Sequence, residues 1–143
     1  MVNRILVKIK KLYPDAKLPF YSTEHAAGFD IYSIIDYELK SGETKTIPTG
    51  ITIEIPEGKV CLIWDRSGLG SKGIHRFAGV IDSDYRGEIK IVLHNHSDLL
   101  FQIKKWDRIA QAIIQDYYRA EFEITDNLSE TQRGELGFGS SGK

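Results

Sequence analysis

Apolar and polar residues alternate along much of the chain, which is the pattern of half-buried β-strands. The alternation runs through four segments, namely Ile5, Val7 and Ile9; Ile51, Ile53 and Ile55; Val60, Leu62 and Trp64; and Ile89, Ile91 and Leu93. Turn-forming residues at 40–43, 56–59 and 95–98 separate several of these segments. The chain is therefore predicted to be mainly β, with short antiparallel strands arranged as a sandwich or a barrel.

Residues 108–118 fit two kinds of secondary structure. Ile109, Ala110 and Ile113 would lie on one side of a helix, whereas Ile109, Gln111 and Ile113 also alternate as in a strand. The segment is rich in β-branched residues, which favour strands. We interpret it as a strand and keep a helix as the alternative.

The alternating pattern fades after Phe122, and the last residues are rich in glycine. From Gln132 on, the only large apolar side chains are Leu136 and Phe138, too few to fix the segment by burial. We therefore expect a β-barrel domain over residues 1–131 and a flexible arm over residues 132–143.

Length and charge narrow the possible functions. A chain of 143 residues and 16.2 kDa is one ordinary domain. With 19 Lys and Arg against 20 Asp and Glu, the net charge of −1 argues against a nucleic-acid partner, because non-specific nucleic-acid binders carry a basic excess. No apolar run approaches the ~18 residues of a membrane span, and the first twelve residues resemble a strand rather than a signal peptide. The single cysteine, Cys61, cannot form an internal disulfide, so we expect a packing thiol and a reducing compartment. Together with the missing membrane-span and signal-peptide patterns, this predicts a cytoplasmic location and no membrane partner.

Two glycine-rich segments carry the groups that bind phosphate. Arg66 is followed by Ser67 and Gly68, and Arg133 precedes the run at 137–142. Guanidinium, hydroxyl and bare backbone N–H groups together suit an anion. Residues 68–73 and 137–142 also match the spacing of the dinucleotide fingerprint, but neither is followed by a helical pattern, so a Rossmann site is excluded. The segments at Arg66 and Arg133 together predict a polyphosphate ligand. The alternative is that the first is only a hairpin turn and the second only a frayed tail.

Two acids lie inside apolar runs, and two histidines share a strand face. Asp82 directly follows Val80 and Ile81, where it is either a positioned base or the first residue of an Asx turn. Asp30 lies inside a similar apolar run. His94 and His96 are two residues apart, but no third ligand is evident, so a zinc site is not predicted.

Five segments taken together resemble the five motifs of the trimeric dUTPase family (dUTP diphosphatases), in the family's order. They are residues 27–30, 66–69, 79–87, 107–111 and 133–142. The resemblance implies a distorted antiparallel β-barrel of jelly-roll type, assembled as a homotrimer with three active sites at subunit interfaces. Each site would take its first, second and fourth motifs from one subunit, the third from a second, and the flexible fifth from another.

The activity implied by the resemblance is Mg²⁺-dependent hydrolysis of dUTP to dUMP and pyrophosphate. This reaction limits the incorporation of uracil into DNA and supplies dUMP for the synthesis of dTMP. Mg²⁺ would be carried on the triphosphate.

The resemblance assigns catalytic roles to three side chains. Asp82 matches the base that orients and deprotonates the water attacking the α-phosphorus, in line with the departing pyrophosphate. Ser67 matches a group that meets the charge developing on the bridging oxygen, and Gln111 matches a contact to phosphates and metal-bound waters. Asp30 matches an acid that supports the metal's water shell or the geometry of the site, and no side chain matches a direct metal ligand.

Other residues match substrate contacts of the family. Tyr85 would pack on the deoxyribose and exclude a 2′-hydroxyl, the backbone around Gly79 would read the uracil edge from a hairpin, and Phe138 would cover the uracil when the arm closes. Arg133, Ser140 and Ser141 would contact the γ-phosphate. The full set expected to bind the substrate is Arg66, Ser67, Gly68, Gly79, Ile81, Asp82, Tyr85, Gln111, Arg133, Phe138, Gly139, Ser140 and Ser141.

Several positions depart from the family pattern. Trp64 and Asp65 stand where a small residue and proline are frequent, so a carboxylate beside Arg66 is expected to weaken anion binding or to orient that arginine. Arg76 falls where some members carry an asparagine near the base, and Trp106 replaces a glycine of the turn before the fourth motif.

Two other functions compete with this interpretation. A dCTP deaminase shares the fold, but it requires a glutamate on the strand after the third motif, where this chain has Val92. A bifunctional nucleotide enzyme belongs to the same alternative. A non-catalytic trimeric regulator would have no need of Asp82, Tyr85, Arg66 and Arg133 together.

Overall fold

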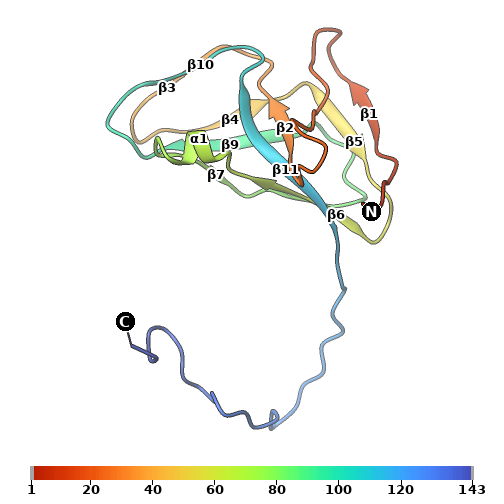
Figure 1. Ribbon diagram of the computed structural model, residues 1–143, viewed down its shortest axis with the longest axis vertical. Helices are drawn as coiled ribbons and strands as arrows, with labels where there is room; N and C mark the ends of the chain where they lie inside the picture. The colour runs from red at the N-terminus through yellow and green to blue at the C-terminus, as the bar shows by residue number, and fades with distance from the viewer. Residues whose placement is uncertain (1, 143) are drawn as a thin grey trace.

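The computed structural model describes residues 2–142, in which eleven short strands and one helical turn form a β body (Figure 1). The elements are β1 (Lys8–Lys11), β2 (Phe29–Tyr32), β3 (Tyr37–Leu39), β4 (Thr44–Pro48), β5 (Ile51–Glu54), β6 (Lys59–Trp64), α1 (Ser67–Gly70), β7 (Ile74–Phe77), β8 (Val80–Ile81), β9 (Lys90–Asn95), β10 (Phe101–Ile103) and β11 (Arg108–Asp116). The mainly-β prediction is confirmed. The segment that also fitted a helix is the strand β11.

Strands far apart in the sequence pair with one another, in nested antiparallel pairs. β2 pairs with β11, β3 with β10 and β4 with β9, while β1–β5, β6–β11, β6–β8 and β7–β9 complete the set. Within residues 2–142, none of these pairings joins strands that follow each other in the chain. The predicted turns at 40–43, 56–59 and 95–98 are present, but each connects strands of different sheets. Nested pairing is the jelly-roll arrangement, here divided into four sheets rather than one closed barrel.

The core is built largely from isoleucine on the inner faces of these strands, because branched side chains pack well on a pleated surface. Its largest fully buried apolar side chains are Ile31, Leu39, Ile47, Ile51, Ile74, Ile89, Ile91, Leu93, Ile103 and Ile109. The predicted thiol, Cys61, is fully buried among them. The alternation at Ile51, Ile53 and Ile55 therefore marks a core face, as expected.

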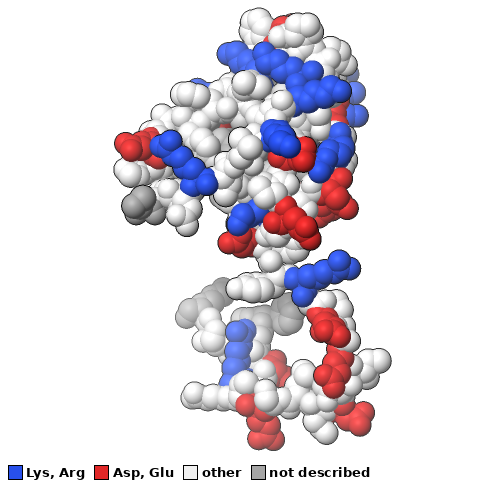
Figure 2. All heavy atoms as spheres, turned by 90° about the vertical axis from the view of Figure 1, so that its right-hand side faces the viewer, with Lys and Arg blue, Asp and Glu red and all other residues white. Residues whose placement is uncertain are grey.

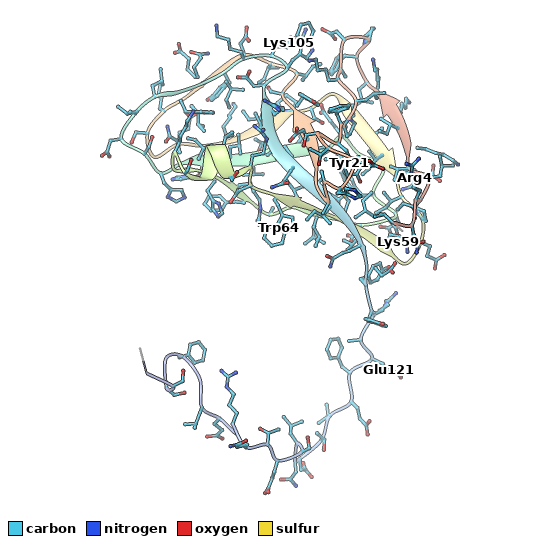
Figure 3. The ribbon with its side chains drawn as sticks, in the orientation of Figure 1. Arg4, Tyr21, Lys59, Trp64, Lys105 and Glu121 are labelled. Carbon is cyan, nitrogen blue, oxygen red and sulfur yellow. The ribbon has the colours of Figure 1, made fainter. Side chains whose placement is uncertain are left out.

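Two strands expose side chains that the alternation places in the interior. On β6 the buried side chains include Cys61 and Ile63, and Trp64 is 46% exposed at the surface of the body (Figure 3). Residues 60–64 are all apolar, so the pattern does not determine which face is inward. β1 covers only Lys8–Lys11 and is exposed throughout, because it pairs with β5 at an outer edge of the body.

The chain leaves the body after β11 and runs as an extended segment without helix or strand over residues 117–142 (Figure 1). Figure 2 shows this segment as a separate lobe below the body. The segment is longer than the arm expected from residue 132. Its role as a lid over another subunit stays a prediction. Within residues 2–142, no helix is long and apolar enough to cross a membrane.

Candidate active site

β11 lies between β2 and β6, and this arrangement brings the first, second and fourth motifs together. Gln111 on β11 is the register partner of Asp30 on β2 and of Trp64 on β6, two residues before Arg66. The Nε of Arg66 donates to Oδ1 of Asp30 at 3.1 Å, and Nη1 of Arg108 lies 3.9 Å from Oδ2 of the same carboxylate. The Asp30 side chain is only 12% exposed. Two guanidinium groups therefore neutralise a largely buried carboxylate, which in turn fixes the direction of Arg66.

Gln111 is held at the same place by a backbone contact and by the absence of a neighbouring side chain. Its Nε2 donates to the carbonyl oxygen of Asp65 at 2.7 Å. A Cβ at Gly28 would lie 2.3 Å from Oε1 of Gln111, so only glycine leaves room for this rotamer. The glycine of the first motif thus positions the glutamine of the fourth.

The second motif forms one helical turn rather than the hairpin turn considered as an alternative. Arg66 occupies the N-cap of α1, and Ser67 and Gly68 are its exposed first residues. The Arg66 carbonyl accepts hydrogen bonds from the backbone of Leu69 at 3.1 Å and Gly70 at 2.9 Å. Ser67 therefore lies exposed in this turn, directly after Arg66 in the chain.

The carboxylate of Asp65 turns away from Arg66. One oxygen accepts from the backbone N–H of Arg76 at 2.8 Å and the other pairs with Nδ1 of His75. The expectation that Asp65 orients Arg66 is therefore wrong, since Asp30 contacts that arginine and Asp65 contacts β7. An effect of Asp65 on anion binding stays a prediction.

The other departures from the family pattern also have local structural explanations. Trp106 adopts a positive φ of 72°, which non-glycine residues rarely do, and its Nε1 donates to the Asp15 carbonyl at 2.9 Å. The turn before the fourth motif therefore keeps a glycine-like conformation. The Arg76 guanidinium lies over the Trp64 ring at 4.9 Å and donates from Nη1 to the Ala78 carbonyl at 3.0 Å.

The third motif begins at a tight link between two sheets. Ala78 and Gly79 have φ values of 58° and 113°, and a Cβ at Gly79 would lie 2.9 Å from Cβ of Ile63. The expected hairpin is wrong in one respect, because in the described residues β7 pairs with β9 and β8 with β6, so the two strands do not pair with each other. The Gly79 carbonyl accepts from the Ile63 N–H at 2.8 Å, so it is occupied within the chain.

Asp82 follows β8 in a turn that is closed by backbone atoms. The Tyr85 N–H donates to the Asp82 carbonyl at 3.2 Å, and the Asp82 side chain is exposed. Tyr85 lies over Gly87 and donates its hydroxyl to the Glu88 carbonyl at 2.8 Å. Ile81 is half-buried on β8, directly before the acid.

Asp82 and Arg66 lie far apart within one chain. Ile81 is the register partner of Cys61, so Asp82 lies opposite Val60, six residues before Arg66. At about 3.3 Å per strand residue, this puts the two backbones roughly 20 Å apart. Neither side chain bridges that distance, so a single chain does not bring the predicted base to the predicted phosphate site.

The fifth-motif residues gather around a hollow of their own. Arg133, Leu136, Gly137, Phe138, Gly139, Ser140 and Ser141 line a space of about 400 Å³. Arg133 donates from Nε to the Leu136 carbonyl at 2.7 Å, and Phe138 is fully exposed with a φ of 50°. The arm therefore carries its arginine, its hydroxyls and its aromatic ring as one local group.

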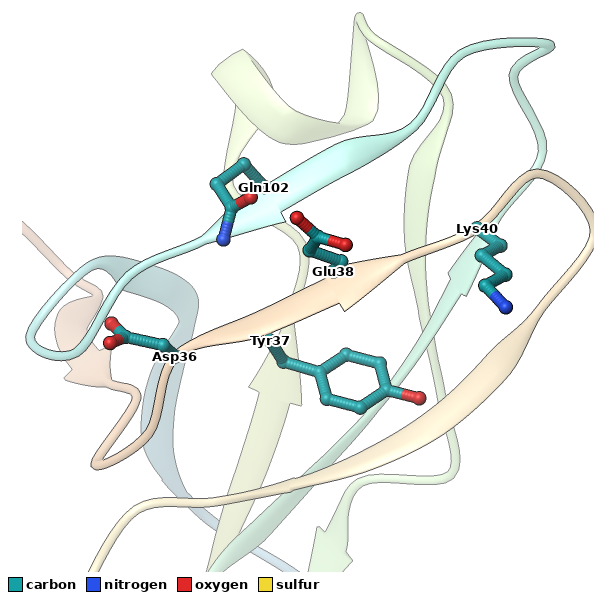
Figure 4. A pocket seen from close by; sticks show the side chains of 5 residues that line it. All are labelled: Asp36, Tyr37, Glu38, Lys40 and Gln102. Carbon is teal, nitrogen blue, oxygen red and sulfur yellow. The ribbon is translucent and has the colours of Figure 1, made fainter.

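A wider hollow of about 510 Å³ lies elsewhere, between β3 and β10. In Figure 4, Glu38 and Gln102 lie on one side of this strand pair and the Tyr37 ring extends from the other. It contains none of the predicted site residues. A choice of site by the volume of the hollow alone would therefore miss the cluster around Arg66.

Residues 14–142 match the family model described as dUTPase. The chain belongs to the dUTPase family. The deoxyuridine 5'-triphosphate nucleotidohydrolase of Nautilia profundicola is 51% identical over 140 residues, which cover 96% of this chain and 99% of that protein. The protein of the same name from Helicobacter hepaticus is 42% identical over 145 residues, covering 99% and 92%.

Solved dUTPase structures share the fold of this chain. The dUTPase of Staphylococcus bacteriophage 80alpha with dUpNHpp is 30% identical, with a TM-score of 0.89 and coverage of 96% of this chain and 99% of that one. The D95N mutant dUTPase from phage phi11 of S. aureus, described with a structural Mg(II) ion, is 25% identical, with a TM-score of 0.80 and coverage of 88% and 100%. The resemblance recognised in the five motifs is confirmed.

Sequence reasoning missed one residue of the cluster around Asp30. Arg108 was placed in the fourth motif but given no role, and the structure sets its guanidinium beside Asp30. Its position at the start of β11, three residues before Gln111, could have indicated that Arg108 lies in the same cluster.

Proposed function

We propose that this protein hydrolyses dUTP to dUMP and pyrophosphate. The observation that carries the proposal is the arrangement of Arg66 and Gln111 beside Asp30 within a chain of the dUTPase family. Relatives over nearly the whole chain are named for this reaction. Nothing supports the deaminase alternative, because β9 carries the half-buried Val92 where that reaction needs a glutamate.

The residues of the cluster would bind and orient the phosphates. Arg66 has its Nε committed to Asp30 and its Nη1 3.5 Å from the Arg108 carbonyl, which leaves Nη2 for phosphate oxygens. Ser67 would donate to the bridging oxygen as its charge develops, and Gln111 would order a phosphate or its waters. Arg108 would add a second positive charge. The protein would then contribute mainly positioning and charge stabilisation rather than covalent chemistry.

Asp82 would act as the base toward the attacking water. Its carboxylate is exposed, since the turn at 82–85 is closed by its backbone carbonyl. Tyr85 would pack on the sugar, with its hydroxyl already tied to Glu88. The backbone of residues 79–81 would read the uracil edge. Because the Gly79 carbonyl is occupied by Ile63, we assign this reading to the other polar groups of that stretch.

Mg²⁺ would be brought to the site on the triphosphate rather than held by side chains. The donor chemistry fits this assignment, because the only largely buried carboxylate in the cluster, Asp30, is already paired with two guanidinium groups. When bound, the ion supplies charge neutralisation on the phosphate oxygens. Asp30 would contribute by holding Arg66 in place.

The working unit would be a homotrimer with shared sites. The roughly 20 Å between Asp82 and Arg66 along β6 supports this proposal, because a neighbouring copy is needed to bring an Asp82 to each Arg66. Each arm would carry Arg133, Phe138, Gly139, Ser140 and Ser141 to a site outside its own chain. The 26 residues from 117 to 142 span up to about 85 Å when extended, which suffices for that reach.

The segment that precedes the arm also supports assembly. From 118 to 124, apolar residues alternate with charged ones, and Tyr118, Phe122 and Ile124 are 94–101% exposed. Figure 3 shows Glu121 of this segment well away from the body. An alternating strand without a partner is a template for pairing with another sheet edge, so we expect it to add to a second subunit.

The experiment that tests the reaction is pyrophosphate release from dUTP with Mg²⁺, with dCTP, dTTP and UTP alongside. We expect dUTP to be cleaved and Asp82→Asn to abolish turnover. A silent protein would favour the trimeric regulator, and ammonia release from dCTP would favour the deaminase. Truncation after Gln132 should cripple turnover while leaving the trimer intact in size measurements.

A mixing experiment tests the shared site. Asp82→Asn and Arg66→Ala proteins, each inactive alone, are mixed and allowed to exchange subunits. Random assembly gives about one quarter of sites with an intact residue of each kind, so activity should recover to about that fraction. Failure to recover, with exchange verified by tagged subunits, would place both residues in a single-chain site.

A further inference from the structure

Three of the four histidines of the chain gather on the outer face of β7 and the end of β9, outside the set of residues assigned to catalysis. They are His75, His94 and His96. We propose that these three side chains form a binding site for Zn²⁺. The proposal is independent of dUTP hydrolysis.

The strand register places the three rings on one face. His75 and His94 are direct register partners, and cross-strand partners place their Cβ atoms about 4.5–5.5 Å apart. His96 follows two residues later and so points to the same side, with its backbone held by a hydrogen bond from its N–H to the Gly73 carbonyl at 2.8 Å. The sequence showed two of these ligands, and β7 supplies the third.

Two of the rings are already oriented through the nitrogen that a metal would not use. Nδ1 of His75 pairs with the Asp65 carboxylate, and Nδ1 of His94 lies 2.7 Å from Oγ1 of Thr44. When Nδ1 carries the proton in these contacts, Nε2 is left as a free lone pair. A second hydrogen-bonding partner on the far nitrogen is the usual companion of a metal-bound histidine. The surroundings of the rings therefore match those of ligands.

The rings lie near one another, but not in the arrangement of a formed metal site. Ring centroids are 4.1 Å apart for His94 and His96 and 6.2 Å apart for His75 and His96. With Zn–N bonds of about 2.0–2.1 Å, two rings on one tetrahedral ion have centroids about 5 Å apart. In the rotamers of this structure, no three His, Cys, Asp or Glu side chains of residues 2–142 surround a common point. The three rings would therefore have to change rotamer to surround one ion, and the exposure of His75 and His96 leaves room for this.

The donor set selects the ion. Three neutral imidazoles suit Zn²⁺ and related transition metals, whereas Mg²⁺ prefers oxygen ligands. A water molecule would complete the tetrahedron on the exposed side. The bound ion would tie β7 to β9 and, through the His75–Asp65 pair, secure the backbone that leads into Arg66.

Metal binding by the full chain tests the proposal. Protein freed of metal with a chelator is titrated with Zn²⁺ against a chromophoric competitor, and Co²⁺ is used to report coordination by its visible absorption. We expect one ion per chain and a tetrahedral Co²⁺ spectrum. His75→Ala, His94→Ala and His96→Ala should each lower the affinity at least tenfold.

His25 is the matched control, because it is the one histidine outside the cluster. His25→Ala should bind Zn²⁺ as the parent does. Thr44→Val removes an orienting partner without removing a ligand and should weaken binding about 10-fold or more. Unaltered affinity in the three cluster variants, or an equal loss in His25→Ala, would overturn the proposal. Unfolding temperatures without metal confirm that the variants fold.

Discussion

Replacing Asp30 with asparagine separates two roles that the sequence left open for this acid. Asp30 either supports the water shell of the metal or holds the geometry of the site. In the structure its carboxylate is 12% exposed and receives the Nε of Arg66 at 3.1 Å. Asp30→Asn keeps the shape and removes the charge, so Arg66 loses its charged acceptor.

The expected loss follows from the strength of that contact. A hydrogen bond between charged groups contributes about 1.5–3 kcal/mol, and the 27% exposure of Arg66 favours a value near 2 kcal/mol. Because Arg66 would bind phosphate in both the ground state and the transition state, the loss should fall mainly on KM. At about 1.4 kcal/mol per factor of ten, kcat/KM for dUTP should fall about 30-fold.

Steady-state pyrophosphate release, measured over both dUTP and Mg²⁺ concentrations, distinguishes the two roles. A geometric role predicts a raised KM and an unchanged Mg²⁺ midpoint at saturating dUTP. A Mg²⁺ midpoint raised tenfold with KM unchanged would refute the reasoning and assign Asp30 to the metal's water shell.

Asp116→Asn is the matched control for this experiment. Asp116 lies at the other end of β11 in an ion pair with Lys59, and its side chain is 76% exposed. Exposed pairs of this kind contribute about 0–1 kcal/mol. Neither kinetic constant should change by more than about twofold, which corresponds to less than about 0.5 kcal/mol.

Three further predictions concern individual residues. Gly79→Ala should lower the free energy of unfolding by about 3 kcal/mol in urea titrations, since φ is 113° and the new Cβ would lie 2.9 Å from a β6 side chain. A loss below about 0.5 kcal/mol would contradict this prediction. Gly28→Ala should lower kcat/KM about tenfold by displacing the Gln111 amide. Gly70→Ala is the control, because a Cβ there meets open space, and it should leave kcat/KM unchanged. Equal activities of the two variants would count against a role for Gln111. Burial raises the pKa of the Cys61 thiol to about 11, so a thiol reagent at pH 8 should modify it only after unfolding; rapid modification of the native protein would disprove that assignment.

Much of the secondary structure follows from local pattern, but the pairing of the strands does not. The alternation at Ile51, Ile53 and Ile55 depends only on neighbouring residues and is enough to identify a strand and its buried face. The pairing of β2 with β11 depends on residues about 80 positions apart, which no local pattern encodes. The turn at 56–59 has the composition of a hairpin, yet it joins strands of different sheets.

The candidate site, like the fold, follows only in part from local sequence pattern. The motifs indicate which residues gather, because each is a short run with its own chemistry. They do not indicate where a carboxylate points: Asp65 stands beside Arg66 in the sequence but contacts His75 and the Arg76 backbone. Asp30 is distant in sequence and contacts Arg66 directly. Direction depends on the strand register, which the sequence pattern leaves undetermined.

The nested pairing of the strands also constrains how the protein is made. During synthesis β2 emerges long before its partner β11, and ribosomes add about 5–20 residues per second, so β2 waits about 4–16 s for the strand it needs. β3 and β4 wait in turn for β10 and β9. β2, β3 and β4 thus remain without these partners until residues 90–116 have been made, and the nascent chain is most exposed to aggregation in that interval.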